Sequence, residues 1–97
     1  MATYIMLSTL TDEGRKTVKA RPERVGEVNK EVEAMGGKVI AQYALLGDYD
    51  FLNVIEAASN EVVARISVEL GARGTMHVTT LAAISPSAFS EVPAARG

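Results

Sequence analysis

Apolar residues in this chain follow two different periods, and the change between them divides the sequence into strands and helices. Four short segments are rich in β-branched, aromatic and aliphatic residues, a composition typical of β-strands. They are Thr3–Thr9, Lys38–Leu46, Phe51–Ala57 and Thr75–Ile84. After the first segment, apolar residues recur at intervals of three, four and three, the period of one face of a helix. This helical stripe consists of Val25, Val28, Val32 and Met35.

Polar residues, proline and glycine mark the ends of the predicted helices. Thr11 can cap a helical segment that begins near Asp12, where the helix dipole favours acidic side chains. Pro22 disfavours helical geometry at Arg21, so we expect a break there before the helix of the Val/Met stripe. Gly36-Gly37 is a stop signal for that helix. A further helix after the third strand is defined by its cap, Ser59 or Asn60, its buried Val62, Val63, Ile66 and Leu70, and its end, Gly71 or Gly74.

The resulting order is strand, helix, strand, strand, helix, strand. The connection between the second and third strands is short, so they form an antiparallel hairpin. This order is that of the split βαβ, or ferredoxin-like, arrangement. We therefore predict an α+β domain over residues 1–84, with a four-stranded antiparallel sheet and two helices on one face.

The segment 85–97, SPSAFSEVPAARG, differs in composition from the rest of the chain. It holds two prolines and three serines and has no apolar period. We expect a flexible C-terminal tail there. Phe89 and Val92 within it can dock on this subunit, dock on a partner, or remain free, and the sequence leaves these alternatives open.

The two faces of the hairpin differ in polarity. With Asp48 and Tyr49 as the central turn residues, Gly47 pairs with Asp50, and side chains alternate between the two faces. We expect the first set, which is almost pure hydrocarbon, to meet the helices. The second set holds two amides but is still too apolar to face water, so we expect it to pair with a second copy of the chain in a homodimer. The first set is Val39, Ala41, Tyr43, Leu45, Leu52 and Val54, and the second is Ile40, Gln42, Ala44, Leu46, Phe51, Asn53 and Ile55.

Such a homodimer would enclose a space lined by Gln42, Asn53 and residues of the outer strands. If Ile5 and Leu7 face the helices, the first strand contributes its other face to this space. The register of the fourth strand is open, because a slip of one residue exchanges its faces. The predicted contributors are Tyr4, Met6 and Ser8 from the first strand, and either His77 with Thr79 or Met76 with Val78 and Thr80 from the fourth.

Composition narrows the possible functions. The chain has 97 residues, a formal net charge of −2, no cysteine and one histidine. These values give no electrostatic footprint for nucleic acid or anionic lipid, and they exclude thiol chemistry and thiolate metal sites. We expect no metal and no cofactor. No apolar run approaches the ~20 residues of a membrane helix, and the N-terminus lacks the features of a signal peptide, so we expect a cytoplasmic protein.

The candidate chemistry is concentrated in the acidic turn Gly47-Asp48-Tyr49-Asp50 and in His77. Gly47 and Asp48 are typical of a tight turn. Asp50 begins an otherwise apolar strand, so it must reach solvent, accept backbone N–H bonds or serve a site. His77 carries the one imidazole of the sequence and, with Asp50, is a candidate catalytic residue. The predicted ligand-binding residues are Tyr4, Gln42, Asn53, His77, Asp48, Tyr49 and Asp50.

Three sequence blocks resemble the GYD domain family, whose Gly-Tyr-Asp signature corresponds here to Gly47-Asp48-Tyr49-Asp50. They are YIMLSTLTDEG at 4–14, RPERVGEVNKEVEAMGGKV at 21–39 and LLGDYDFLNVIEA at 45–57. The resemblance extends from Tyr4 to about Ile84. It implies a dimeric α/β barrel and no particular reaction. Dimeric α/β barrels more widely include ligand-sensing domains, cofactor-independent monooxygenases, small isomerases and haem-handling proteins, and a fold does not fix a function.

We therefore expect an oligomeric small-molecule-binding or sensing module without a strong catalytic apparatus. One alternative is a cofactor-independent monooxygenase or isomerase that acts on a small apolar substrate. Another is a structural assembly subunit. A cavity that contains His77 together with Gln42 or Asn53 would favour the enzyme, and a sheet face without a cavity would favour the structural subunit.

Overall fold

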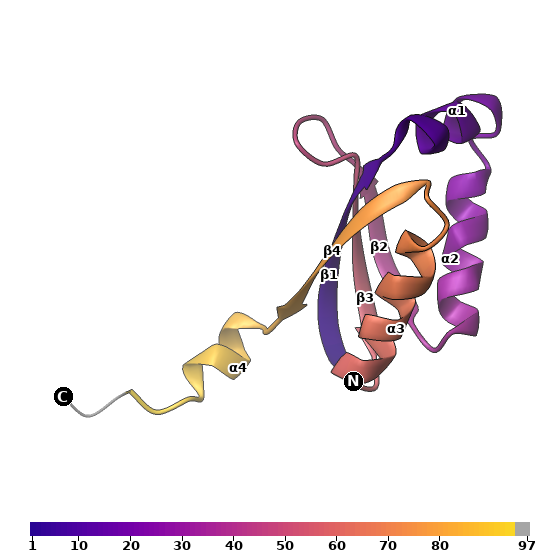
Figure 1. Ribbon diagram of the computed structural model, residues 1–97. Helices are drawn as coiled ribbons and strands as arrows, with labels where there is room; N and C mark the ends of the chain where they lie inside the picture. The colour runs from indigo at the N-terminus through magenta and orange to yellow at the C-terminus, as the bar shows by residue number, and fades with distance from the viewer. Residues whose placement is uncertain (95–97) are drawn as a thin grey trace.

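The computed structural model describes residues 1–94, and it has a four-stranded antiparallel sheet with helices on one side (Figure 1). The strand order in the sheet is β2-β3-β1-β4. The predicted α+β class is confirmed. In chain order the elements are β1 (Ala2–Leu10), α1 (Asp12–Ala20), α2 (Arg24–Ala34), β2 (Lys38–Ala44), β3 (Phe51–Ala57), α3 (Asn60–Gly71), β4 (Met76–Ala83) and α4 (Pro86–Ser90).

The helices begin and break where the sequence predicts. The Thr11 side chain accepts a hydrogen bond from the backbone N–H of Gly14 at the start of α1, and Ser59 caps α3 in the same way. Arg21 leaves the helical region with φ −139°, and Pro22 follows it, so α1 and α2 are separate helices. Because of this break, α1 lies near one end of the sheet while α2 runs along it (Figure 1).

The core lies between the sheet and the two longer helices. Four buried sheet residues, Tyr4, Met6, Ile55 and Ala57, form one cluster with Val32 of α2 and with Val63, Ile66 and Leu70 of α3. Met6 pairs with Asn53 across the sheet, and Asn53 pairs with Gln42. The helix-covered face is therefore the one that carries both amides.

The predicted orientation of the sheet is wrong in this respect. The prediction puts the hydrocarbon set under the helices, but the set with Gln42 and Asn53 is there instead. The helix-covered side accepts Gln42 because its amide exchanges two hydrogen bonds with Asn29 of α2, at 2.9 and 3.1 Å. A buried amide with both groups satisfied carries little penalty. The predicted space between two sheets, lined by Tyr4, Gln42 and Asn53, is thus contradicted.

The hairpin register also differs from the trial register by two residues. Ala44 pairs with Phe51, and the backbone N–H of Leu45 donates to the Asp50 carbonyl oxygen at 2.8 Å. A shift of two residues preserves the faces, so the grouping of Gln42 with Phe51 and Asn53 stands. A bulge between Val39 and Ala41 reverses the start of β2 and turns Val39 towards the core.

The opposite side of the sheet, here called the outer face, is covered by no helix of residues 1–94. Its centre is the hydrocarbon set joined by apolar residues of β1 and β4, and its ends are polar. The side chains that share this face by register are Ile5, Leu7, Ala41, Tyr43, Leu52, Val54 and Leu81, with Thr9, His77 and Thr79 at one end.

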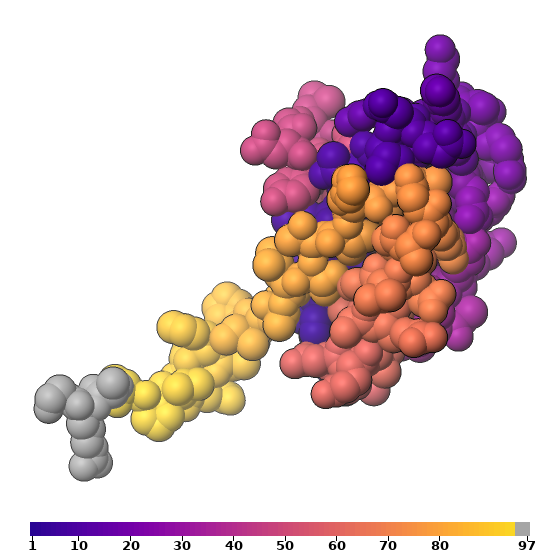
Figure 2. Space-filling view, in the orientation of Figure 1, coloured from indigo at the N-terminus to yellow at the C-terminus, as the bar shows by residue number. Residues whose placement is uncertain are grey.

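The chain after β4 extends away from the domain (Figure 2). It contains the short helix α4, where the sequence predicts a tail without periodicity; the last three residues of that predicted tail, 95–97, lie outside the described residues. Ser85 caps α4 and Pro86 occupies its first turn, which explains the helix locally. Within residues 1–94, no helix has the length and apolar character needed to cross a membrane.

Candidate functional site

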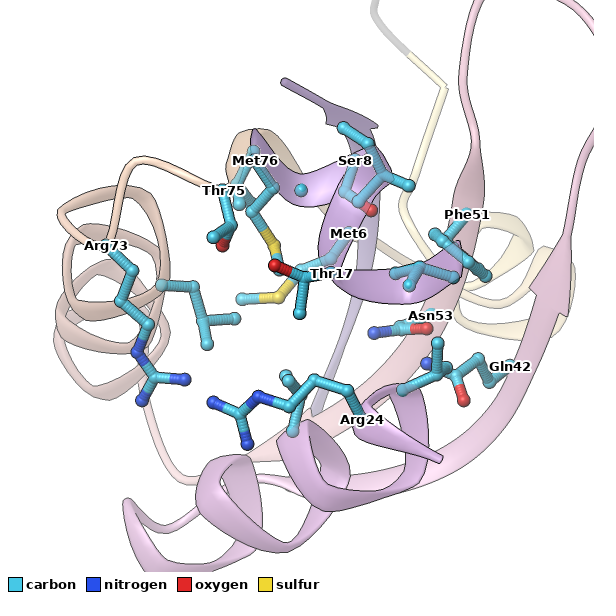
Figure 3. A pocket seen from close by; sticks show the side chains of 17 residues that line it. Met6, Ser8, Thr17, Arg24, Gln42, Phe51, Asn53, Arg73, Thr75 and Met76 are labelled. Atoms are coloured by element: carbon cyan, nitrogen blue, oxygen red, sulfur yellow. The ribbon is translucent and has the colours of Figure 1, made fainter. Parts of the chain in front are cut away.

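A pocket of about 210 Å³ lies between the helix-covered face of the sheet and α1, α2 and α3 (Figure 3). Its lining is mainly apolar and comes from the sheet and from α1, α2 and α3. The main apolar lining residues are Met6, Leu10, Val18, Val25, Val28, Phe51, Leu70, Met76 and Val78. The volume equals that of roughly seven waters at ~30 Å³ each, and it lies below the ~300–1,000 Å³ of drug-sized sites. The pocket therefore has room only for a small molecule.

The floor of the pocket carries an unsatisfied carboxamide. The Oδ1 atom of Asn53 is buried and, among the described residues, has no hydrogen-bond partner. Its neighbour Gln42 is fully paired with Asn29, so it does not relieve Asn53. An unpaired buried acceptor costs about 1–3 kcal/mol. A bound molecule that donates a hydrogen bond to Asn53 would recover part of that cost.

Two arginines lie together on another side of the pocket (Figure 3). Arg24 of α2 donates to Glu31 at 3.0 Å, and Arg73, which follows α3, also donates to Glu31. Arg24 in addition lies 3.6 Å from Glu27. The glutamates neutralise the two guanidinium groups. Arg24 and Arg73 therefore provide hydrogen-bond donors at the pocket without a strong net charge.

The hydrogen bond from Arg73, assisted by Arg24, lowers the pKa of the Glu31 carboxyl below its ordinary value. A carboxyl with a lowered folded-state pKa contributes stability above its unfolded-state pKa and loses it as the pH falls through the folded-state pKa. We therefore expect Glu31→Gln to reduce the unfolding free energy near neutral pH, by less than about 1 kcal/mol because the pair is partly exposed. Urea unfolding should show this difference vanishing in acid; a pH-independent difference would contradict the assignment.

Asp50 holds the loop between β2 and β3, which carries the Gly47–Asp50 signature and is here called the signature loop, at the end of β1. Its carboxylate Oδ2 accepts a hydrogen bond from the backbone N–H of Leu10 at 2.7 Å, and its own N–H donates to the Ser8 carbonyl oxygen at 2.8 Å. The Arg15 guanidinium is 3.9 Å from the same carboxylate. Of the three roles open to this acid, the structure supports acceptance of a backbone hydrogen bond. Gly47 has φ +121°, a conformation that favours glycine.

Asp50→Ala is expected to lower the unfolding free energy by about 2 kcal/mol, because it leaves the partly buried Leu10 N–H without its charged acceptor. Asp48→Ala is the matched control. The Asp48 side chain is exposed and accepts no hydrogen bond among residues 1–94, so its loss should change stability by less than about 0.5 kcal/mol. Urea denaturation of both variants measures the difference. Equal effects would show that the loop is not held by Asp50.

Gly47 and Asp50 are explained by the backbone, which leaves Asp48 and Tyr49 as the signature residues whose side chains make no hydrogen bond within residues 1–94. Tyr49 lies at the loop tip and is partly exposed, while the neighbouring Leu46 is fully exposed. The loop projects beyond the sheet (Figure 1), and Asp50 joins its base to the end of β1. A loop that is fixed at its base and presents Leu46 and Tyr49 beside the exposed Asp48 is a candidate contact surface for another protein.

The predicted site residues are therefore distributed over four places. Gln42 and Asn53 line the pocket, as does Ser8. Tyr4 is a core residue whose hydroxyl donates to Asn60. Asp48, Tyr49 and Asp50 belong to the loop. His77 pairs with Thr9 on the outer face, so it is on the opposite side of the sheet from Asn53.

Arg24 and Arg73 are pocket residues that sequence analysis does not identify. Their common partner is Glu31, which is 42 positions from Arg73. No local pattern connects residues so far apart in the chain, and Arg24 stands in a mixed stretch of charges typical of a helix surface. No group of three or more His, Asp or Glu within residues 1–94 is arranged to hold a metal ion.

The element order and the strand order define a small α+β domain of the split βαβ class. The sequence model of the GYD domain matches residues 4–92, and this chain belongs to the GYD domain family, as the sequence blocks predict. The match continues past Ile84 and includes α4.

Two further comparisons give a relative and a fold neighbour. The chain is 52% identical over 85 residues to a Thermus thermophilus protein described as "Glutamine synthetase and cystathionine beta-lyase binding protein"; the alignment covers 87% of this chain and 90% of that protein. The fold is similar to the crystal structure of TTHA0845 from the same organism, with a TM-score of 0.56, 20% identity, and coverage of 88% of this chain and 95% of that one.

Proposed function

We propose that this protein is a homodimeric binding protein that takes up a small metabolite and associates with a metabolic enzyme. The observation that carries the proposal is the pocket whose floor holds the unpaired Asn53 Oδ1. Apolar walls with a few convergent polar groups are typical of small-molecule sites. The ligand class that fits is a small, mostly apolar molecule with a hydrogen-bonding head group for Asn53.

The lining supports binding over catalysis. Among the 17 lining residues there is no carboxylate and no imidazole, the side chains that most often perform general acid–base chemistry. His77, the candidate catalytic residue, is separated from Asn53 by the sheet. The enzymatic alternative needs these groups in one cavity.

The outer face supports a homodimer. Its centre is a continuous apolar patch on two central strands, where Leu7 pairs with Leu52 and Ile5 with Val54. These four residues are partly exposed, and Tyr43 and Leu81 on the same face are exposed by 61% and 48%. Such an apolar face needs a cover, and a second copy offers the same patch in an isologous contact. The sheet-to-sheet pairing expected from the sequence is thus kept in the proposal, but through the opposite face.

The loop tip supports a protein partner. The curated relative is described as binding glutamine synthetase and cystathionine β-lyase. Leu46 and Tyr49, on the loop held at its base by Asp50, offer an apolar and an aromatic contact, and Tyr is favoured at interfaces. We assign the enzyme contact to this loop. The sequence predicts a cytoplasmic location. This location is consistent with association with a metabolic enzyme and stays a prediction.

The test measures binding of the immobilised protein to glutamine synthetase and to cystathionine β-lyase from its own organism. We expect the wild-type chain to bind at least one of them and Leu46→Ser/Tyr49→Ser to bind about tenfold or more weakly, a loss of at least ~1.4 kcal/mol. Val68→Ser, on an exposed position of α3, is the control and should bind as wild type. A wild-type protein that binds neither enzyme would refute the partner assignment.

A further inference from the structure

The chain after β4 forms an arm, residues 84–94, that extends away from its own domain (Figures 1 and 2). Its apolar side chains are exposed to about the same degree: Ile84 by 70%, Phe89 by 67% and Val92 by 67%. Phe89 and Val92 are three positions apart, and the Val92 N–H donates to the Phe89 carbonyl oxygen at 3.2 Å. Residues so spaced lie on one side of a helical turn.

The arm has a defined local structure. The Ser85 hydroxyl accepts a hydrogen bond from the Ala88 N–H at 3.1 Å, and the Ser90 hydroxyl donates to the Pro86 carbonyl oxygen at 2.8 Å. A helix of five residues is nevertheless far below the ~12–15 residues at which isolated helices become even marginally stable in water. It needs a surface to pack on. The GYD match extends to residue 92, so the arm belongs to the pattern of the family rather than to an unrelated extension.

We infer that the arm of each protomer packs Phe89 and Val92 against the other protomer of the dimer, beside the outer face. This inference rests on the homodimer proposed above. The arm continues the direction of β4, an edge strand, and so leads away from its own core. In an isologous dimer the contact occurs twice, with each arm on the other copy.

The outer face alone is smaller than a stable dimer interface, so a second copy bound there needs further contact area. Strands of seven to nine residues rise ~3.3 Å per residue and lie ~4.8 Å apart, so four of them give a planar footprint of about 500 Å². A stable specific interface buries about 800 Å² on each partner. Each of the two arms carries three exposed apolar side chains. Packed on the other protomer, these side chains add apolar contact area to that of the outer face.

The chain has no tryptophan, so Phe89→Trp provides a single fluorescent reporter on the arm. We expect its emission to be blue-shifted and acrylamide quenching to be several-fold weaker at concentrations where the protein is dimeric by light scattering. On dilution to the monomer, and in a Val54→Glu background, the emission should shift to the red and quenching should rise. The dilution series decides the question even if Val54→Glu fails to fold.

Each other outcome overturns the inference in a distinct way. A reporter shielded equally in monomer and dimer would place the arm on its own domain. A reporter exposed in a protein that is dimeric would show a free arm and leave the homodimer intact. A reporter shielded only after addition of glutamine synthetase would assign the arm to the enzyme. A protein that is monomeric at all concentrations would refute the proposed homodimer itself.

A second measurement uses the dimer affinity. Phe89→Ser/Val92→Ser in the full chain should raise the dimer dissociation constant at least about tenfold, since two apolar side chains per arm lose their burial. Val68→Ser changes a similarly exposed apolar residue outside the arm and should leave the constant unchanged. An unchanged constant in the arm variant would contradict the inference.

Discussion

Gly14→Ala is expected to destabilise the protein by about 2–3 kcal/mol and to lower its melting temperature by roughly 10–20 °C. Gly14 is buried in the first turn of α1, and a Cβ atom there would lie 2.0 Å from the Thr75 carbonyl oxygen. That oxygen belongs to the backbone and already accepts a hydrogen bond from the Thr11 N–H at 3.0 Å. It cannot turn aside, so α1 must move away from the start of β4.

The helix propensity of alanine offsets only about 1 kcal/mol of this cost. Gly26→Ala separates the two effects, because a Cβ atom at position 26 in α2 meets nothing within 4 Å. It should stabilise the protein by about 0.5–1 kcal/mol. Thermal unfolding followed by circular dichroism compares the two. Equal melting temperatures for Gly14→Ala and wild type would contradict the close approach of α1 to Thr75.

Val54→Glu is expected to dissociate the homodimer. Val54 pairs with Ile5 and Ala41 on the outer face, and an isologous interface contains each position twice. Two carboxylates would then be buried without partners, at several kcal/mol per ion, so the dissociation constant should rise at least ~100-fold. Light scattering should report 10.3 kDa in place of twice that mass.

The same substitution on the helix side gives the control. Val68 lies on α3 and is 64% exposed, so Val68→Glu makes the same chemical change away from the outer face. It should remain a dimer. If a folded Val54→Glu variant keeps the wild-type mass, the outer face is not the interface; if both variants dissociate, the effect is not specific to that face.

The secondary structure could be predicted because its signals are local. Thr11, Pro22 and Ser59 act through hydrogen bonds or steric contacts within a few residues, and each lies where a helix begins or breaks. The choice of the covered sheet face depends instead on a contact across the chain. Gln42 is acceptable under the helices only because Asn29 pairs with it, and hydrophobicity alone favours the other face.

Less of the site could be predicted from the sequence, because most of its contacts also join residues that are far apart in the chain. Gln42 and Asn53 are identifiable as polar interruptions of apolar strands, and both line the pocket. Asp50 is conspicuous beside an apolar strand, but its hydrogen-bond partner Leu10 is 40 positions away. Arg24 and Arg73 meet through Glu31 only after folding. The Ser85-Pro86 cap, in contrast, is a local signal for α4 within the compositionally tail-like segment.

The pocket is tested most directly by native mass spectrometry of the protein purified gently from cells, compared with an Asn53→Leu variant. Leucine fills a similar volume but removes the carboxamide that the proposed ligand contacts. We predict a dimer, or a multiple of dimers, with a bound small-molecule mass that is retained by wild type and lost from Asn53→Leu. A bound mass that survives in Asn53→Leu, or a wild-type dimer without any bound mass from cells, would contradict the role assigned to the pocket.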